Sequence, residues 1–338
     1  MINIIFTGLI SIEERFKKSI LEFRLRKSEI SQIIVSTWLG ELDKYKGLRN
    51  FLDENCITIV ESVPPTECKG SILFQMKSLH VGLDSIKDKN LMIFKTRPDL
   101  YIDPKSLIEI SNLDLEISDD NALIFEKKIW VPWFEITKPF YLADECIYAT
   151  YNDMKKLVNY DMIYDSYYVG DSGLSHVRRF IHPFLKQYPI FNIYLKYLST
   201  TAHGTPNRFD VLNKFLDNED YHYFLNLYYY IVRSHFYIGL EGTKDYILFR
   251  EWSAIDFTLP DTINEAFTLK YSWKKSFGHI YSNDNQWLDR LKFEYKINFI
   301  IDEESLRRIH KYAVAKKTET LKQDKFSKIK KIIKILIK

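Results

Sequence analysis

Residues 91–99 read LMIFKTRPD, four apolar residues followed directly by a segment rich in charge. A short apolar run of this kind predicts a strand that is buried on both faces. Similar runs occur at residues 2–10, 32–38 and 56–60, and a segment with apolar residues at helical spacing follows each of them. Strands that alternate with helices predict an α/β fold in which a mostly parallel sheet is flanked by helices.

The polar residues at the ends of these strands are the first candidates for a functional site. In a parallel sheet the carboxyl ends of the strands meet at one edge, and ligands bind beyond that edge. The residues concerned are Thr7 and Gly8, Thr37 and Trp38, Glu61, and Lys95, Arg97 and Asp99. We therefore expect them to line one crevice, although they lie far apart in the sequence.

The end of the fourth strand offers the most specific chemistry. Alternation along an extended segment places Lys95, Arg97 and Asp99 on one face. Lysine and arginine bind phosphate groups directly, and aspartate binds the divalent cation that often accompanies a diphosphate. The segment predicts a diphosphate site, and a surface ion pair at the end of a strand is the alternative interpretation.

Asp144 and Glu145 end a later apolar run that begins at Phe140. A carboxylate at such a position is suited to remove a proton from a hydroxyl group as a general base. A helix cap or a solvated turn is the structural alternative, and the spacing alone favours it.

Composition and motifs exclude several functional classes. The 338 residues carry a net charge of only +3, which argues against a nucleic-acid partner. Three cysteines without regular spacing predict neither a disulfide framework nor a zinc site. The sequence lacks G-x-G-x-x-G, Walker A and G-x-S-x-G motifs, which argues against a dinucleotide-dependent dehydrogenase, a P-loop ATPase and an α/β-hydrolase.

The C-terminal part of the chain has a different pattern. We predict a boundary near residue 185, a mainly helical region over 186–315 and a basic amphipathic helix over 316–338. That last helix has the composition of one that lies on an anionic membrane surface, and a solvated helix packed on its own domain is the alternative. The N-terminus does not resemble a signal peptide, and no run reaches the ~18 apolar residues of a membrane span. We therefore expect a cytoplasmic protein that contacts the inner membrane at most peripherally.

Several of these residues together resemble a known family. In chain order, the matching residues are Ser36-Thr37-Trp38, Gln75 with Ser78 and Gly82, Lys95-x-Arg97-x-Asp99, and Phe140-x-x-x-Asp144. Their types and order resemble the WavE family of lipopolysaccharide-synthesis proteins. The resemblance covers about the first half of the chain, residues 1 to 160. Each motif is short, and their common order gives the resemblance its weight.

The resemblance implies a glycosyltransferase with a GT-A-like fold, in which residues 1–185 form the catalytic domain and 186–315 the acceptor side. It implies a nucleotide-sugar donor and an oligosaccharide or lipid-linked glycan as acceptor. Thr7, Gly8, Thr37 and Glu61 would then line the nucleoside pocket, with Trp38 and Gln75 also contacting the donor.

The same resemblance suggests roles for the charged residues. Lys95 and Arg97 would stabilise the leaving nucleoside diphosphate, and Asp144 or Glu145 would act as the base. Asp99 would bind Mg²⁺ or Mn²⁺, or else orient Arg97. The chain lacks the first aspartate of the usual Asp-x-Asp motif and has Arg97 in its place, so a metal-independent enzyme is the alternative.

Two other functions share parts of this pattern. A sugar-phosphate or polyol-phosphate transferase of cell-envelope synthesis would use the same diphosphate site and transfer a phosphoryl group. A noncatalytic scaffold of a polysaccharide assembly complex would retain the fold and bind no nucleotide.

Overall fold

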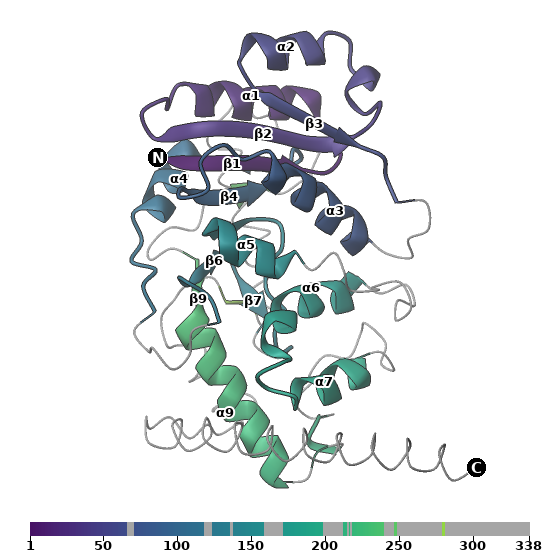
Figure 1. Cartoon of the computed structure of the whole chain (residues 1–338), viewed down its shortest axis with the longest axis vertical. Coiled ribbons are helices and arrows are strands. Elements are labelled where there is room, and N and C mark those ends of the chain that lie inside the picture. The colour runs from purple at the N-terminus through teal and green to yellow at the C-terminus, as the bar shows by residue number, and fades with distance from the viewer. Residues whose placement is uncertain are drawn as a thin grey trace, which may run out of the picture.

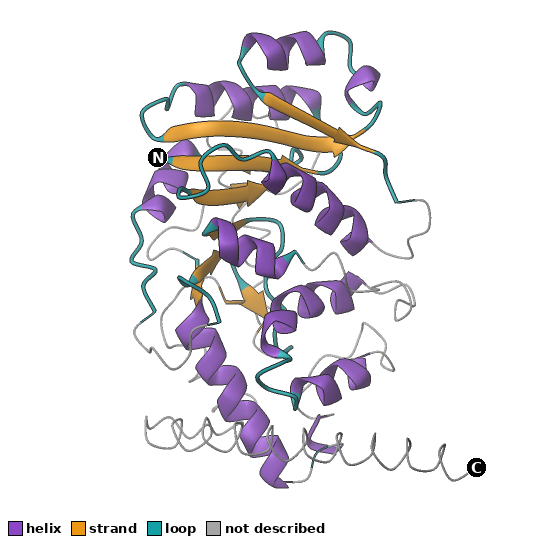
Figure 2. Ribbon diagram, in the orientation of Figure 1, coloured by secondary structure: helices purple, strands orange, loops and turns teal. Residues whose placement is uncertain are grey.

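The computed structural model describes residues 1–65, 71–117, 124–135, 138–158, 172–198, 212–214, 216, 218–239, 247–248 and 279–280 (Figure 1). Its centre is a seven-stranded sheet in the order β3-β2-β1-β4-β8-β6-β9 (Figure 2). The strands are β1 (Ile2–Thr7), β2 (Ile30–Trp38), β3 (Thr58–Ser62), β4 (Met92–Thr96), β6 (Ile129–Val131), β8 (Ile147–Ala149) and β9 (Phe236–Ile238).

One strand of this sheet runs against the others. Strands β1 to β4 pair in parallel, and β8 pairs antiparallel with both β4 and β6. Strand β9 is parallel to β6, so β6 and β9 share the direction of the first four strands. The predicted mostly parallel sheet flanked by helices is therefore confirmed. The reversed strand brings its amino end to the edge where the parallel strands have their carboxyl ends.

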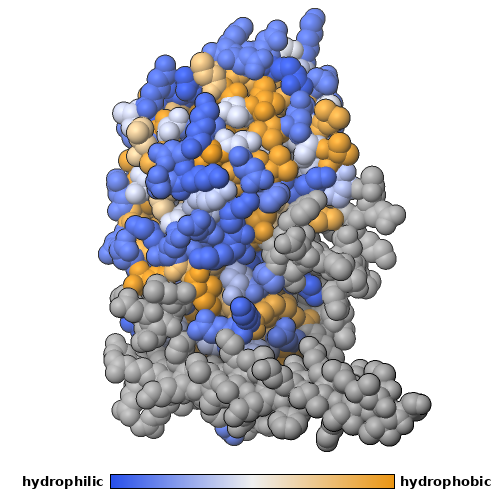
Figure 3. Space-filling view, in the orientation of Figure 1, coloured by the Kyte–Doolittle hydropathy of each residue, from blue (hydrophilic) through white to orange (hydrophobic). Residues whose placement is uncertain are grey.

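Helices cover both faces of the sheet, because alternate residues of each strand are apolar on opposite sides. In β1, Ile4 and Phe6 belong to one core and Ile5 belongs to the other. The helices that pack on the first core are α1 (Glu13–Arg24), α2 (Leu48–Glu54) and α4 (Pro104–Ser111). Those on the second are α3 (Ser71–Asp84), α5 (Tyr151–Leu157) and α6 (Ser172–Ile181). On the side of α3 and α5, hydrophilic side chains cover much of the described surface, with apolar ones between them (Figure 3).

Aromatic residues extend the second core away from the sheet. They come from the short 3₁₀ helix η4 (His182–Phe184), α7 (Phe191–Leu198) and α9 (Asn218–His235), which follow α6. The Phe140 ring packs edge-on against Phe191 at 4.9 Å and Tyr228 at 5.2 Å between ring centroids. The tyrosines of α9 thus serve core packing. The boundary near residue 185 stays a prediction, and residues 316–338 lie outside the described residues.

Strand β9 lies beside β6 and is the edge strand of the sheet. The indole Nε1 of Trp130 donates to the Gly239 carbonyl at 2.8 Å, and the Gly239 N–H donates to the Val131 carbonyl at 2.9 Å. Two further pairs of short strands lie outside this sheet. They are β5 (Tyr101–Ile102) with β10 (Ile247–Leu248), and β7 (Phe134–Glu135) with β11 (His279–Ile280).

The apolar run from Phe140 to Ala143 is not a strand of the large sheet. Phe140 has a left-handed backbone, with φ at 59°, which interrupts an extended run. Leu142 makes a single antiparallel bridge to Phe134, and β8 begins only at Ile147. Asp144 and Glu145 therefore lie in the turn that precedes a strand.

Helix α3 lies unusually close to the sheet at Gly82. An added Cβ there would lie 2.9 Å from Cγ2 of Ile5 and 3.1 Å from Cβ of Ser36. The Ser36 hydroxyl also donates to the Ser78 carbonyl of the same helix at 2.6 Å. The missing side chain lets α3 pack against the ends of β1 and β2.

We expect Gly82→Ala to lower the free energy of unfolding by about 1 kcal/mol or more. Overpacking typically costs about 1–3 kcal/mol and outweighs the gain in helix propensity of about 1 kcal/mol. Denaturant unfolding would measure the change, with Lys77→Ala in the same helix as the control. A Gly82→Ala protein as stable as the control would show that the helix is not held at this distance.

Candidate functional site at the carboxyl edge of the sheet

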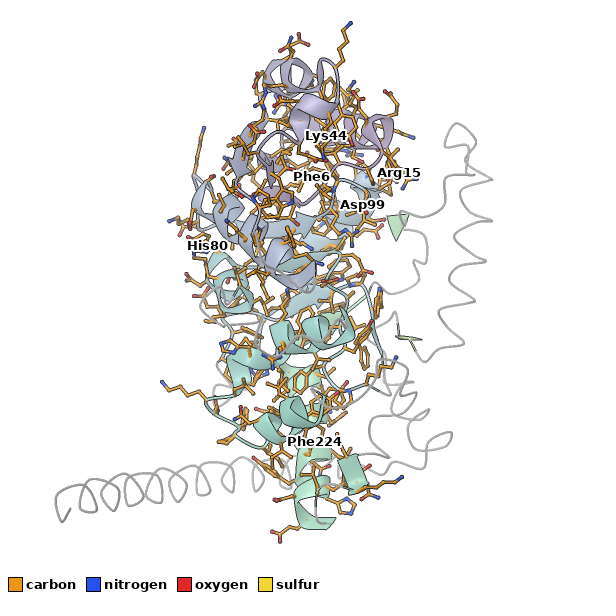
Figure 4. The ribbon with its side chains drawn as sticks, turned by 90° about the vertical axis from the view of Figure 1, so that its right-hand side faces the viewer. Phe6, Arg15, Lys44, His80, Asp99 and Phe224 are labelled. Carbon is orange, nitrogen blue, oxygen red and sulfur yellow. The ribbon has the colours of Figure 1, made fainter. Side chains whose placement is uncertain are left out.

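The structure brings the predicted strand-end residues to one edge. Thr7 pairs with Ser36, and Thr37 pairs with Glu61 across neighbouring parallel strands. Lys95 of β4 pairs with Ile147 of the reversed strand. Figure 4 is viewed from the side at which the parallel strands of Figure 1 end, and it therefore looks onto this edge.

The threonine hydroxyls at this edge bind the main chain of neighbouring segments. Thr7 Oγ1 donates to the Thr96 carbonyl at 3.2 Å, and Thr37 Oγ1 donates to the Gly8 carbonyl at 2.9 Å. Gly8 has a φ of 103°, a conformation that glycine adopts without strain. These contacts hold the ends of β1, β2 and β4 together. The predicted nucleoside-binding role of these residues stays a prediction.

The loop after β1 is fixed by residues that follow β2. The Ile10 N–H donates to Oε1 of Glu41 at 3.0 Å, and the Tyr45 hydroxyl donates to the Ile10 carbonyl. Both main-chain groups of Ile10 are thereby bonded to the segment around the 3₁₀ helix η1 (Leu42–Lys44). This loop therefore has a defined course at the edge.

Two other predicted residues have partners of their own. Both carboxylate oxygens of Glu61 accept from Nη2 of Arg49, at 3.1 and 2.9 Å. The Trp38 ring is buried and packs edge-on against Phe74 of α3, with 5.5 Å between ring centroids. A ligand at this end of the sheet would meet an ion pair rather than a lone carboxylate.

Arg97 and Asp99 form a bidentate ion pair. Nε and Nη2 of Arg97 donate to the two Asp99 oxygens at 2.9 and 2.7 Å. The Asp99 side chain is 5% exposed and that of Arg97 is 26% exposed, so the pair presents the guanidinium group to solvent. Burial is the largest single effect and acts to lower the pKa of Arg97, but Asp99, Asp144 and Glu145 together raise that pKa above its ordinary value.

Arg15 of α1 binds the main chain of Asp99, one member of this pair. Its side chain is buried, and Nη1 donates to the Asp99 carbonyl at 3.2 Å. Figure 4 shows Arg15 beside Asp99 at the edge. Burial lowers the pKa of Arg15, and the Asp99 carboxylate partly offsets this effect. One cation thus binds the Asp99 main chain while another binds its side chain.

Lys95 is fully buried, at 0% exposure. Its ammonium group donates to the carbonyls of Asp144 and Glu145, the second at 3.3 Å. Burial and the nearby Arg179 lower the pKa of Lys95 to about 8, although Asp144 acts to raise it. The amine therefore points into the protein toward main-chain oxygens.

Helix α6 adds a charged residue that the sequence analysis did not identify. Arg179 is fully buried, with Nη1 at 3.6 Å from Oδ2 of Asp144. Its Nη2 donates to Oε1 of Gln75 in α3 at 3.1 Å. Gln75 and Asp144, both predicted site residues, are therefore joined through this arginine.

Glu145 has a different environment from Asp144. The residue is partly exposed, but its Oε2 atom is buried and has no hydrogen-bond partner among the described residues. Its charge also contributes to the raised pKa of Arg97. Of the two adjacent residues, Asp144 is buried beside a guanidinium group, and Glu145 is the one that is partly exposed.

Arg15 and Arg179 were missed because their sequence context is ordinary. Arg15 stands directly before Phe16 of the apolar stripe in α1, and Arg179 directly before Phe180 of α6. A charged residue beside an apolar stripe is usually a solvated flank of the helix. The burial of these guanidinium groups depends on how the helices sit on the sheet.

The residues around Asp99 do not by themselves fit a divalent cation. Such a cation takes six or more oxygen ligands, whereas both Asp99 oxygens accept from Arg97. Within the described residues, no group of three or more histidine, cysteine, aspartate or glutamate side chains is placed to hold a metal ion. The metal-binding role of Asp99 stays a prediction.

Comparisons with known proteins show only distant similarity. No protein-family model matches the chain, and no curated protein matches it. One similar solved structure is a glycosyltransferase involved in the glycosylation of the major capsid of PBCV-1, with a TM-score of 0.30 and 11% identity. That match covers 55% of this chain and 76% of the other.

A second similar structure is HddC from Yersinia pseudotuberculosis, with a TM-score of 0.26, 13% identity, and coverage of 49% of this chain and 81% of that one. Similarities of this size concern the fold at most and carry no argument about function. In the described part of the chain, every helix is too short or too polar to cross a membrane.

The buried amine of Lys95 leads to a prediction about stability and pH. Its pKa of about 8 in the folded protein lies below its ordinary value, so the unfolded chain binds more protons above pH 8. We therefore expect the free energy of unfolding to rise by about 1 kcal/mol between about pH 7 and pH 9 from this residue.

Denaturant unfolding of the wild type and Lys95→Met at several pH values would measure this contribution as the difference between the two proteins. The comparison is needed because burial raises the pKa of Cys146 to about 12, which opposes the rise at higher pH. Parallel pH profiles for the two proteins would contradict the prediction.

Proposed function

We propose that this chain is a glycosyltransferase that takes a sugar from a nucleotide-sugar donor. The observation that carries the proposal is the pairing of two groups at the carboxyl edge of the sheet. Arg97 is a partly exposed residue oriented by Asp99, and Glu145 is a partly exposed residue whose carboxylate lies near enough to affect the pKa of Arg97. A transfer from a diphosphate to a hydroxyl needs a cation for the leaving group and a base for the acceptor.

The electrostatics of the edge suit a diphosphate. Around Asp99 and the turn at Asp144 and Glu145 lie four cationic side chains, and three carboxylates offset most of their charge. The cations are Arg15, Lys95, Arg97 and Arg179, and the carboxylates are Asp99, Asp144 and Glu145. Arg97 is the member of the cationic set that solvent reaches, so we assign the contact with the leaving diphosphate to it. The buried cations add a fixed positive potential behind it.

Glu145 is the better candidate for the general base. A base must reach the acceptor hydroxyl, within hydrogen-bond distance or through one water molecule. Asp144 is buried and faces Arg179, whereas Glu145 is partly exposed. Asp144 then serves to neutralise Arg179 within the protein.

We favour a mechanism in which the Arg97–Asp99 pair stabilises the diphosphate without a cation bound by Asp99. The bidentate contact supports this choice, because a cation would compete with Arg97 for the same two oxygens. Asp99 then holds the guanidinium plane in position for phosphate.

The finer parts of the proposal rest on the resemblance of the strand-end residues. They are membership of a WavE-like family with a GT-A-like fold, an oligosaccharide or lipid-linked glycan as acceptor, a role in lipopolysaccharide or capsule synthesis, a cytoplasmic location, and peripheral membrane contact through residues 316–338. A phosphoryl-transferring enzyme and a noncatalytic scaffold are the alternatives, and the first experiment below distinguishes the scaffold.

The first test is a thermal-shift panel of nucleotide sugars and nucleoside diphosphates with and without Mn²⁺. A ligand at about 100 times its dissociation constant adds about 2.7 kcal/mol of stability, and we expect such a shift without Mn²⁺. Arg97→Gln should abolish most of it, and Arg24→Gln, in the last turn of α1, is the matched control.

A shift that requires Mn²⁺ would return Asp99 to the role of a metal ligand. The absence of a shift with every nucleotide would remove the transferase proposal and favour the scaffold.

The second test concerns the base. We expect Glu145→Gln to lower transfer to the acceptor by about 10²–10⁴-fold, while the affinity for the nucleoside diphosphate stays within about threefold of the wild type. Glu116→Gln, an exposed carboxylate paired with Lys127, is the control. Normal turnover by Glu145→Gln would exclude this residue as the base.

A further inference from the structure

The turn that carries Asp144 and Glu145 lies between the interrupted run at Phe140 and the start of β8 at Ile147. The sheet fixes β8 but not the two residues that precede it by a few positions. Their carbonyl oxygens instead accept from the ammonium group of Lys95 in the neighbouring strand. We infer that Lys95 is a positioning residue, which holds the main chain of this turn so that Glu145 reaches the acceptor, and that it does not bind the donor phosphate.

The burial of the lysine supports this assignment. Lys95 is 0% exposed, and its ammonium group is occupied by two main-chain acceptors. A group that binds the leaving diphosphate has to meet it, and among Lys95, Arg97 and Arg179, Arg97 is the cation that is partly exposed. The inference rests on the proposed transferase function and replaces the role of a phosphate ligand expected for Lys95.

The strength of the hydrogen bonds from Lys95 to the turn depends on the charge of its amine, because hydrogen bonds from an ionised donor are about twice as strong as neutral ones. The charged and titratable groups that act on Lys95 are Arg179 from α6, Asp144 in the turn, Arg97 directly after β4 and Cys146 directly before β8. Together with burial, they place its pKa at about 8, so the amine loses its proton in mildly alkaline solution. The turn should loosen as that happens.

The test measures two quantities against pH, from about pH 6 to pH 10. They are the kcat for transfer or donor hydrolysis and the Kd of the nucleoside diphosphate. For the wild type we expect kcat to fall about tenfold per unit above about pH 8, while Kd changes less than about threefold. Lys95→Arg, which keeps its charge, should move the fall to higher pH.

Two variants complete this test. Lys95→Met should lower kcat by about tenfold or more at pH 7 and leave Kd within about threefold of the wild type. The exposed Lys127→Met is the matched control and should retain both values.

The inference is overturned by either of two results. The first is a wild-type kcat that stays level up to about pH 10, which requires no variant. The second is a Lys95→Met protein with Kd raised about tenfold and kcat unchanged, which would make Lys95 a phosphate ligand.

Hydrogen exchange separates this inference from the proposed function. If the wild type binds and turns over no nucleotide sugar, the function fails, but the positioning role is still tested by the amides of residues 143–147. After correction for intrinsic rates, their protection should fall above about pH 8 in the wild type but not in Lys95→Arg. Equal protection in both proteins across this range would overturn the positioning role as well.

Discussion

A buried ammonium group needs acceptors, and the turn before β8 supplies them to Lys95. Taking a charge out of water is costly, and burial is the largest cause of the lowered pKa of this amine. The other contacts of the edge follow from the same constraint. Arg179 faces the carboxylate of Asp144, and Arg15 donates to the carbonyl of Asp99. The segments that carry Asp99 and Glu145 are thus each held by a buried cation that binds their main chain, whereas Arg97 and Glu145 are partly exposed.

Lys95 lowers the stability of the folded protein, but it also binds the main chain of the turn before β8. A protonated Lys95 destabilises the folded state relative to an uncharged one, yet the protonated form makes the stronger bonds to the turn. An apolar residue at this position of β4 would remove the desolvation cost and leave two carbonyls without their donor. Functional sites commonly retain such unfavourable groups when geometry depends on them.

Much of the first half of the fold could be predicted from the sequence. The apolar runs that became β1 to β4 are long enough to be distinct, and the helices between them have clear periodicity. Strands β8 and β9 have three residues each, too few to show a period, and nothing in their composition indicates that β8 runs in the opposite direction. The run at Phe140 looked equally apolar, but its left-handed backbone removed it from the sheet. Direction and register depend on tertiary packing rather than on local pattern.

For the candidate site, the sequence indicated the edge but not the partners. Thr7, Thr37, Lys95 and Asp99 were expected there because residues at the ends of parallel strands converge. Their contacts could not be predicted, since two hydroxyls bind main-chain carbonyls and Lys95 points inward.

The position of β9 in the sheet has a consequence for how the chain can be divided. Strand β9 is the edge strand of the sheet, so a fragment that ends near residue 185 would lack it and would have β6, paired only with β8, at the edge instead. The smallest piece that keeps all seven strands and the contacts of Gly239 with β6 extends through Gly239, so a cut at the change in sequence pattern would remove a strand from the sheet.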